Sequence, residues 1–189
     1  AKEIDISELE GFSPEEFKPK LINNFQSKIS NVYDLISESI MPVILVGNGV
    51  RLSRAEKEFK TLAEKLGIPI LLSWKAADLF EENHKLNFGR PGAVGQRAAN
   101  IIQQKSDLLI ILGARMDMGQ TAYMHKYLAP KAKKIMIDID EFEIKKMDTK
   151  IHLPINVDAK IFIHEMLNFF EKQNMNFNFE SWLNECNKL

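Results

Sequence analysis

Four clusters of unusual residues follow four apolar segments of the chain, and their residue types suit contact with a nucleotide. They are Gly47-Asn48-Gly49, Ser73-Trp74-Lys75, Gly113-Ala114-Arg115 and Asp138-Ile139-Asp140. Glycines let a phosphate approach the backbone, arginine pairs with phosphate, and carboxylates accept hydrogen bonds from ribose hydroxyls. Each cluster alone is a weak signal, so the prediction of a binding site depends on the fold bringing them together.

The pair Gly47 and Gly49 allows two interpretations. Amide groups exposed at the start of a helix would suit a phosphate, but a tight strand-to-helix turn that binds nothing needs the same glycines. The dinucleotide-binding pattern Gly-x-Gly-x-x-Gly is incomplete, because Leu52 stands at the third glycine position. A simple dehydrogenase is therefore disfavoured.

A loop over residues 88–95 contains three glycines and Arg90 ahead of a predicted helix. Ordering such a loop is costly in conformational entropy unless close approach of another group requires the glycines. We expect this loop, with Gly92 and Gly95, to contact a ligand; a plain crossover connection is the alternative.

Charged side chains near the strand ends also have two interpretations each. Arg115 needs an anionic or carbonyl partner, which is either a phosphate or a neighbouring carboxylate such as Asp117. Asp138 and Asp140 either accept hydrogen bonds from a ribose or cap the following helix. The methionines of this region, Met116, Met118 and Met124, are expected to pack rather than to bind.

A parallel sheet would position these clusters. Apolar runs predict strands over 43–46, 70–72, 108–112, 134–138 and 153–157, and helical periodicity falls between them. Strands that are apolar throughout are buried on both faces, and intervening helices require parallel connections. We therefore predict an α/β fold: a doubly wound open parallel sheet, Rossmann-like, with helices on both faces. Ligands bind such sheets at the carboxyl ends of the strands.

Local signals place some helix ends. Ser53 is predicted to cap a helix, with Glu56 as its capping-box partner, and Gly67 to end that helix. A longer helix is predicted over residues 21–39. For the chain as a whole we predict a lead-in or linker over 1–26, a central domain over 27–172 and a C-terminal linker helix over 173–189.

The composition excludes several classes of protein. Hydrophobic residues make up 45% of the 189 residues and charged residues 27%, as in globular domains. A net charge of -1 gives no reason to expect nucleic acid or an anionic membrane as a partner. The single cysteine, Cys186, indicates a reducing compartment, so we expect a cytoplasmic protein. The four histidines lack metal-ligand spacing, and no serine elbow or P-loop pattern is present.

Residues 27–170 resemble the central domain of thiamine-diphosphate-dependent enzymes of the acetolactate synthase type. The matching segments are PVILVGNGV (42–50), LGIPILLS (66–73), GRPGAVGQRAANIIQQKSDLLIILGARMD (89–117) and KKIMIDIDEFEI (133–144). The resemblance implies a parent of three domains that cleaves a 2-oxo acid with thiamine diphosphate and magnesium. The catalytic glutamate and the Gly-Asp-Gly motif of that family belong to the flanking pyrimidine- and diphosphate-binding domains.

What the resemblance implies for this chain is a bracing role, with no catalytic residue, no metal ligand and no activity alone. It also implies a homo-oligomeric parent and FAD or ADP in the strand-end cleft. The cofactor-binding residues predicted there are Gly47, Asn48, Gly49, Ser73, Trp74, Gly92, Gly95, Ala114, Arg115, Asp138 and Asp158.

Two departures from the family pattern keep other functions open. The usual Gly-Met-His-Gly-like loop is replaced by residues 90–95, and the bulky Trp74 and Lys75 follow the second strand. The alternatives are a stand-alone nucleotide-binding or flavoprotein-type regulatory module and a scaffold whose cleft holds nothing.

Overall fold

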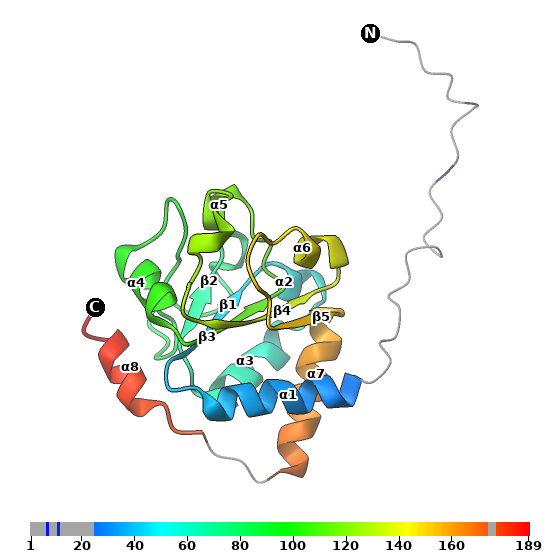
Figure 1. Cartoon of the computed structure of the whole chain (residues 1–189). Helices are drawn as coiled ribbons and strands as arrows, with labels where there is room; N and C mark the ends of the chain where they lie inside the picture. Colours follow the sequence, from blue (N-terminus) through cyan, green and yellow to red (C-terminus); the bar gives the residue numbers. More distant parts are fainter. Residues whose placement is uncertain (1–6, 8–10, 12–24, 174–176) are drawn as a thin grey trace.

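The computed structural model describes residues 25–173 and 177–189, together with Ser7 and Gly11. Its centre is a sheet of five parallel strands in the order β2-β1-β3-β4-β5 (Figure 1). The strands are β1 (Pro42–Val46), β2 (Ile70–Leu72), β3 (Leu108–Leu112), β4 (Lys133–Asp138) and β5 (Leu153–Asn156). The predicted fold class and all five predicted strands are confirmed.

Helices cover both faces of this sheet (Figure 1). In chain order they are α1 (Phe25–Glu38), α2 (Gly49–Leu52), α3 (Glu56–Leu66), α4 (Arg97–Lys105), α5 (Met118–Thr121), α6 (Glu141–Lys145), α7 (Ala159–Lys172) and α8 (Glu180–Cys186), with single 3-10 turns at Trp74–Ala76 and His125–Tyr127. Helices α1, α3 and α7 share one hydrophobic core with the sheet, while α4, α6 and α8 share the other. None of the helices in the described ranges is long and apolar enough to cross a membrane.

The strand β3 shows why apolar runs form the middle of this fold. Its five residues are all buried. Leu108, Ile110 and Leu112 belong to the core under α1, α3 and α7, and the alternate residues Leu109 and Ile111 belong to the core under α4. Successive side chains of a strand point to opposite faces, so a strand covered on both faces must be apolar at every position.

The order of the strands creates a crevice at one end of the sheet. From β1 the chain crosses outward to β2, whereas β3 pairs with the other side of β1 and is followed outward by β4 and β5. The loops after β1 and β3 therefore leave in opposite directions. This is the position at which open parallel sheets bind ligands.

Of two helix boundaries predicted from the sequence, one is confirmed and the other is wrong. Gly67 ends α3 with a left-handed φ of 62°, and its N–H donates to the carbonyl oxygen of Ala63 at 2.9 Å, as expected. The predicted capping role of Ser53 is wrong. The chain enters α2 already at Gly49, so Ser53 follows that helix and its hydroxyl donates back to Val50; Ala55 precedes α3 without a side-chain cap.

The end regions bear on the predicted division of the chain. The lead-in and the first residues of the helix predicted over 21–39 lie mostly outside the described residues; α1 is described from Phe25. At the other end, α8 packs against the sheet, with Trp182 and Cys186 each 3% exposed. Burial raises the pKa of the Cys186 thiol to about 12, so this cysteine is a protonated core residue.

Candidate functional site

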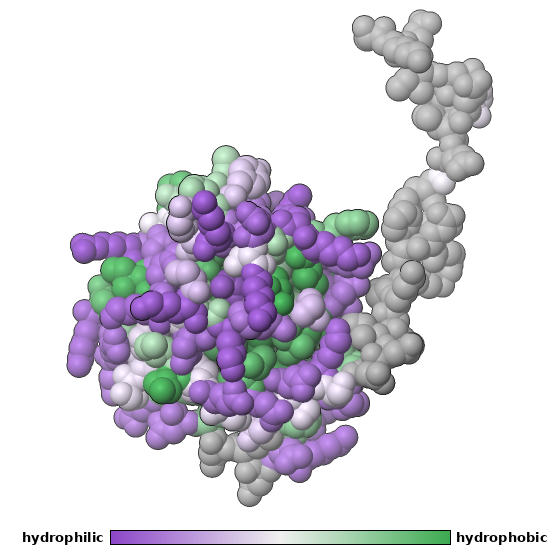
Figure 2. All heavy atoms as spheres, in the orientation of Figure 1, coloured by the Kyte–Doolittle hydropathy of each residue, from purple (hydrophilic) through white to green (hydrophobic). Residues whose placement is uncertain are grey.

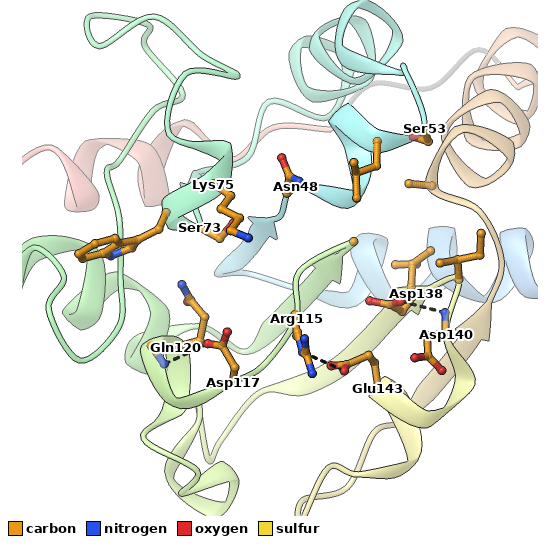
Figure 3. Close-up of a pocket in the computed structure, with 18 of the residues that line it drawn as sticks. Asn48, Ser53, Ser73, Lys75, Arg115, Asp117, Gln120, Asp138, Asp140 and Glu143 are labelled. Atoms are coloured by element: carbon orange, nitrogen blue, oxygen red, sulfur yellow. Dashed lines mark hydrogen bonds and ion pairs between the residues drawn. The ribbon is translucent and has the colours of Figure 1, made fainter. Parts of the chain in front are cut away.

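A cleft with a volume of about 850 Å³ lies at the carboxyl ends of the strands. Clefts of this size accommodate small-molecule ligands and cofactors. Its walls come from the loops after β1, β2, β3 and β4 and from the start of α7 (Figure 3). The four clusters found in the sequence thus meet at one place, as the parallel arrangement requires.

The predicted site residues divide into two groups. Those that line the cleft are Asn48, Gly49, Ser73, Trp74, Arg115, Asp138 and Asp158. Those that lie outside its lining are Gly47, Gly92, Gly95 and Ala114. Direct cofactor contact stays a prediction for the first group, while packing explains the residue types of the second.

Gly47 and Gly49 serve the contact between β1 and β3. A Cβ atom at position 47 would overlap the carbonyl oxygen of Gly113 and the Cα of Ala114. The N–H groups of Gly47 and Gly49 donate to Leu112 and Gly113 carbonyl oxygens, both at 2.9 Å. Of the two interpretations left open, these contacts favour the tight strand-to-helix turn, because neighbouring backbone carbonyl oxygens already accept the hydrogen bonds of both amides.

The glycine loop at 89–95 packs behind one wall of the cleft. Gly92 has a φ of 122°, and a Cβ atom there would overlap the carbonyl oxygen of Gly119 in α5. The Asn100 side chain holds the loop by accepting from the N–H of Gly92 at 2.9 Å and donating to its carbonyl oxygen at 3.1 Å. Gly95 folds back against Pro91. The close approach that the glycines indicated is thus between loop and α5.

Arg115 pairs with a carboxylate that sequence reasoning missed. Its Nε lies 3.0 Å from Oε1 of Glu143 in α6, and Glu143 also pairs with Lys146. Asp117, the partner considered from the sequence, instead caps α5 by accepting from the N–H of Gly119 at 3.0 Å. The pairing depends on β3 lying beside β4, which carries α6 at its end, so no spacing along the chain could reveal it.

Carboxylates gather on the β4 side of the cleft. Asp140 caps α6 by accepting from Phe142 N–H at 2.9 Å, and Asp158 caps α7 by accepting from Lys160 N–H at 2.8 Å. The capping interpretation of Asp140 is confirmed. Burial, assisted by the negative charges of Glu143 and Asp140, raises the pKa of the Asp138 carboxyl.

Several lining residues were not among the predicted cofactor-binding residues. Lys75, from the cluster after β2, lines the cleft, and so do Gln120, Met118 and Tyr123; Met118 is 61% and Tyr123 70% exposed. Met116 is fully buried, as predicted, but the expectation that Met118 and Met124 pack is wrong because both are exposed. Among the described residues, no group of three or more His, Cys, Asp and Glu side chains is arranged to hold a metal ion.

Comparison with known proteins places this fold in context. Residues 29–166 match the family model described as "Thiamine pyrophosphate enzyme, central domain". The chain is 38% identical over 151 residues to the "Probable acetolactate synthase large subunit" of Methanocaldococcus jannaschii, covering 80% of this chain and 25% of that protein. It is 37% identical over 160 residues to the "Acetolactate synthase" of Mycobacterium bovis, covering 85% of this chain and 25% of that protein.

A third relative shows the same relationship. The "Acetolactate synthase large subunit" of Corynebacterium glutamicum is 38% identical over 140 residues, which is 74% of this chain and 22% of that protein. The chain therefore spans about a quarter of the length of these relatives.

Proposed function

The chain belongs to the family of thiamine pyrophosphate enzyme central domains, of the acetolactate synthase type, and on this premise we propose that its strand-end cleft binds an adenine nucleotide, FAD or ADP. The observation that carries the proposal is the convergence of Asn48, Ser73 and Asp138, from three different strand ends, on one cleft at the switch point of the sheet.

The parent protein, in this proposal, cleaves a 2-oxo acid and transfers the product to an acceptor. Thiamine diphosphate would supply the electron sink for that chemistry. The residues of this chain do not fit that cofactor: the sequence has no Gly-Asp-Gly motif, and the described residues offer no cluster for the accompanying magnesium. The catalytic groups would therefore lie in flanking pyrimidine- and diphosphate-binding domains, in a homo-oligomer.

The nucleotide proposal is tested by titrating the 189-residue chain with FAD, ADP and NAD. The melting temperature is measured at each ligand concentration. FAD or ADP should stabilise the chain selectively, and a ligand at 100 times its dissociation constant adds about 2.7 kcal/mol. Absence of any shift with FAD and ADP would contradict the proposal and favour a scaffold whose cleft holds nothing.

A matched pair of variants assigns any shift to this cleft. Ile139 lines the cleft and is 57% exposed, whereas Ile40 is 76% exposed and precedes β1 at the opposite end of the sheet. Ile139→Glu adds a further negative charge and a longer side chain to the carboxylate side of the cleft, so it should weaken the binding of a negatively charged nucleotide there roughly tenfold. Ile40→Glu makes the same exposed change away from the cleft and should leave binding unchanged.

A bracing role is the second proposed function, and exposed apolar side chains around the cleft support it. Leu52 (77%), Trp74 (61%) and Phe142 (71%) are exposed at this end of the molecule. Figure 2 shows green, apolar atoms over the α5 end and in a hollow of the viewed face. Large apolar side chains exposed at one end of a domain support a protein contact there.

The bracing proposal predicts that a substitution at the contact changes stability only when the flanking domains are present. Phe142→Asp should lower the melting temperature of the full-length protein but not of the 189-residue chain, because its ring is exposed here. Ile40→Asp is the control. Equal melting temperatures for the Phe142→Asp variant and unmodified full-length protein would argue against the contact.

A further inference from the structure

Arg51 connects two walls of the cleft although it lies outside the lining of the cleft. It stands in α2, just after the loop that follows β1, and its side chain reaches the segment that follows β2. One guanidinium nitrogen, Nη1, donates to the carbonyl oxygen of Lys75 at 2.5 Å and to Oδ1 of Asn48 at 3.2 Å. The other, Nη2, pairs with the Asp78 carboxylate at 2.5 Å. Arg51 therefore joins the loop after β1 to the loop after β2.

The shape of the guanidinium suits this position. Its two terminal nitrogens donate to separate acceptors, whereas the ammonium of a lysine donates from a single point. The Arg51 side chain is 34% exposed and that of Asp78 81%, so the ion pair contributes little to stability. The contacts fix geometry instead, because they determine where the Lys75 carbonyl and the Asn48 amide lie.

The contact with Arg51 also determines which atom Asn48 offers to a ligand. A guanidinium only donates hydrogen bonds, so the Asn48 atom that faces it is the oxygen, Oδ1. The amide nitrogen Nδ2 is then the atom that Asn48 can turn toward the cleft that it lines. Figure 3 shows Asn48 beside Ser73 and Lys75 on one side of the cleft. This wall therefore favours ligand groups that accept hydrogen bonds.

The segment after β2 is otherwise shaped by hydrogen bonds close to it in the sequence and by its attachment to β1. At its start, the N–H of Ser73 donates to the carbonyl oxygen of Val46 at 2.9 Å. Further along, the N–H groups of Ala76 and Leu79 donate to the carbonyl oxygens of Ser73 and Ala76 at 2.9 and 3.0 Å. These bonds form the turn, and Arg51 adds the hydrogen bonds that join it to the loop after β1.

We propose that Arg51 is a positioning residue of the cleft. It holds the loop after β2 against the loop after β1, and it orients the Asn48 amide so that Nδ2 donates to an acceptor group of the ligand. The inference rests on the proposed nucleotide-binding function for the identity of that ligand. The contact between the loops is a property of the ligand-free chain and can be tested separately.

Amide hydrogen exchange of the ligand-free 189-residue chain tests the contact between the loops. Arg51→Met should speed exchange at the Ala76 and Leu79 amides about fivefold, because the turn loses the hydrogen bonds that limit its opening. Exchange at the β3 amides should stay unchanged, which separates a loosened loop from a destabilised domain. Lys60→Met is the matched control, since Lys60 pairs with Glu81 at 3.5 Å and neither residue lines the cleft. It should leave exchange at Ala76 and Leu79 unchanged.

Calorimetric titration with ADP tests the consequence for binding and separates position from charge. Arg51→Met and Arg51→Lys should both weaken ADP binding, roughly fivefold, because neither side chain can make the forked contact. Asp78→Ala should also weaken it, since Arg51 loses a partner that holds it in place. A pure charge effect predicts the opposite for Asp78→Ala, because removing a carboxylate favours an anionic ligand. Lys60→Met should leave ADP binding unchanged.

Asn48→Asp separates the orientation of the amide from the contact between the loops. Aspartate keeps an oxygen for Arg51 but has no Nδ2 donor, so ADP binding should weaken roughly tenfold. Hydrogen exchange at Ala76 and Leu79 should stay as in the wild type. Wild-type ADP affinity in Asn48→Asp would overturn the role assigned to Nδ2.

The remaining outcomes distinguish the positioning role from the nucleotide function. Wild-type exchange at Ala76 and Leu79 in Arg51→Met would overturn the contact between the loops. Wild-type ADP affinity in Arg51→Lys, or tighter binding in Asp78→Ala, would show that Arg51 acts through its charge and would overturn the positioning role. Failure of the wild type to bind ADP or FAD would contradict the nucleotide function, and the exchange result would still decide whether Arg51 holds the two loops.

Discussion

The indole N–H of Trp182 in α8 donates to the carbonyl oxygen of Pro42, the first residue of β1, at 3.1 Å. Trp182 is 3% exposed, and α8 is further held by an ion pair between Lys105 and Glu185 at 2.7 Å. The residues after the Asn-rich segment therefore contribute to the core over α4. The segment 173–189, predicted as a linker helix, therefore contains a helix that packs against the domain.

Trp182→Ala should destabilise the domain by about 3–5 kcal/mol, because it leaves a large cavity between α8 and the sheet. Trp182→Phe should cost less, about 1–3 kcal/mol, since it keeps most of the apolar volume but leaves the Pro42 carbonyl without its donor. Urea unfolding measures both. Glu185→Gln is the control and should cost under about 1 kcal/mol, because its ion pair is exposed. Equal stabilities for the Ala and wild-type proteins would refute the packing argument.

Gly47 should tolerate no side chain, although it is the residue that resembled part of a phosphate-binding turn. Gly47→Ala would drive its Cβ into backbone atoms of Gly113 and Ala114, neither of which can move without separating β1 from β3. We expect a loss of more than about 3 kcal/mol of unfolding free energy or failure to fold.

Gly67→Ala is the matched substitution. Nothing lies within 4 Å of a Cβ at that position, but its φ of 62° disfavours alanine, so the cost should be about 1 kcal/mol. Chemical denaturation of the two variants provides the comparison. A Gly47→Ala protein as stable as Gly67→Ala would contradict the assigned packing role.

The strands could be predicted because their signal is local. Five apolar residues in a row at Leu108–Leu112 indicate burial on both faces, and a parallel sheet covered by helices supplies it. From the parallel sheet it also follows that the four strand-end clusters meet. The location of the cleft could therefore be predicted from these apolar runs and the residues that directly follow them in the sequence.

The side-chain interactions in the cleft were harder to predict because the interacting residues come from separate elements. The Arg115–Glu143 pair depends on which strand lies beside β3, and no property of the residues near Arg115 indicates that neighbour. The capping pattern at Ser53 and Glu56 failed because the chain turns into α2 four residues earlier than that pattern assumes. Gln120 is recognisable as a lining residue only once the fold places α5 beside the cleft.

Stability should depend on pH through Asp138. Burial first, and then the charges of Glu143 and Asp140, raises the pKa of this carboxyl above its ordinary value of 3.8. The folded state therefore holds the proton more tightly than the unfolded state does. The favourable contribution is fully present below pH 3.8 and is lost as the pH rises through the raised pKa.

Asp138→Asn should consequently gain stability relative to wild type as the pH increases, and the gain should level off above the raised pKa. Asparagine keeps an oxygen that can accept the Asp140 N–H, which lies 3.0 Å from Asp138 Oδ1. Denaturation at several values between about pH 3 and pH 7 measures the difference. A relative stability that falls with rising pH would reverse the assigned sign.

Trp74 should report ligand binding through its fluorescence. Of the two tryptophans, Trp74 lines the cleft and is 61% exposed, whereas Trp182 is 3% exposed in the core under α8. A flavin or adenine ring entering the cleft changes the surroundings of the first indole and leaves the second untouched. Titration with FAD or ADP should therefore quench the emission of the wild type and of Trp182→Phe. Trp74→Phe should lose the quenching while calorimetry still detects binding; quenching that persists in Trp74→Phe would place the ligand away from this wall of the cleft.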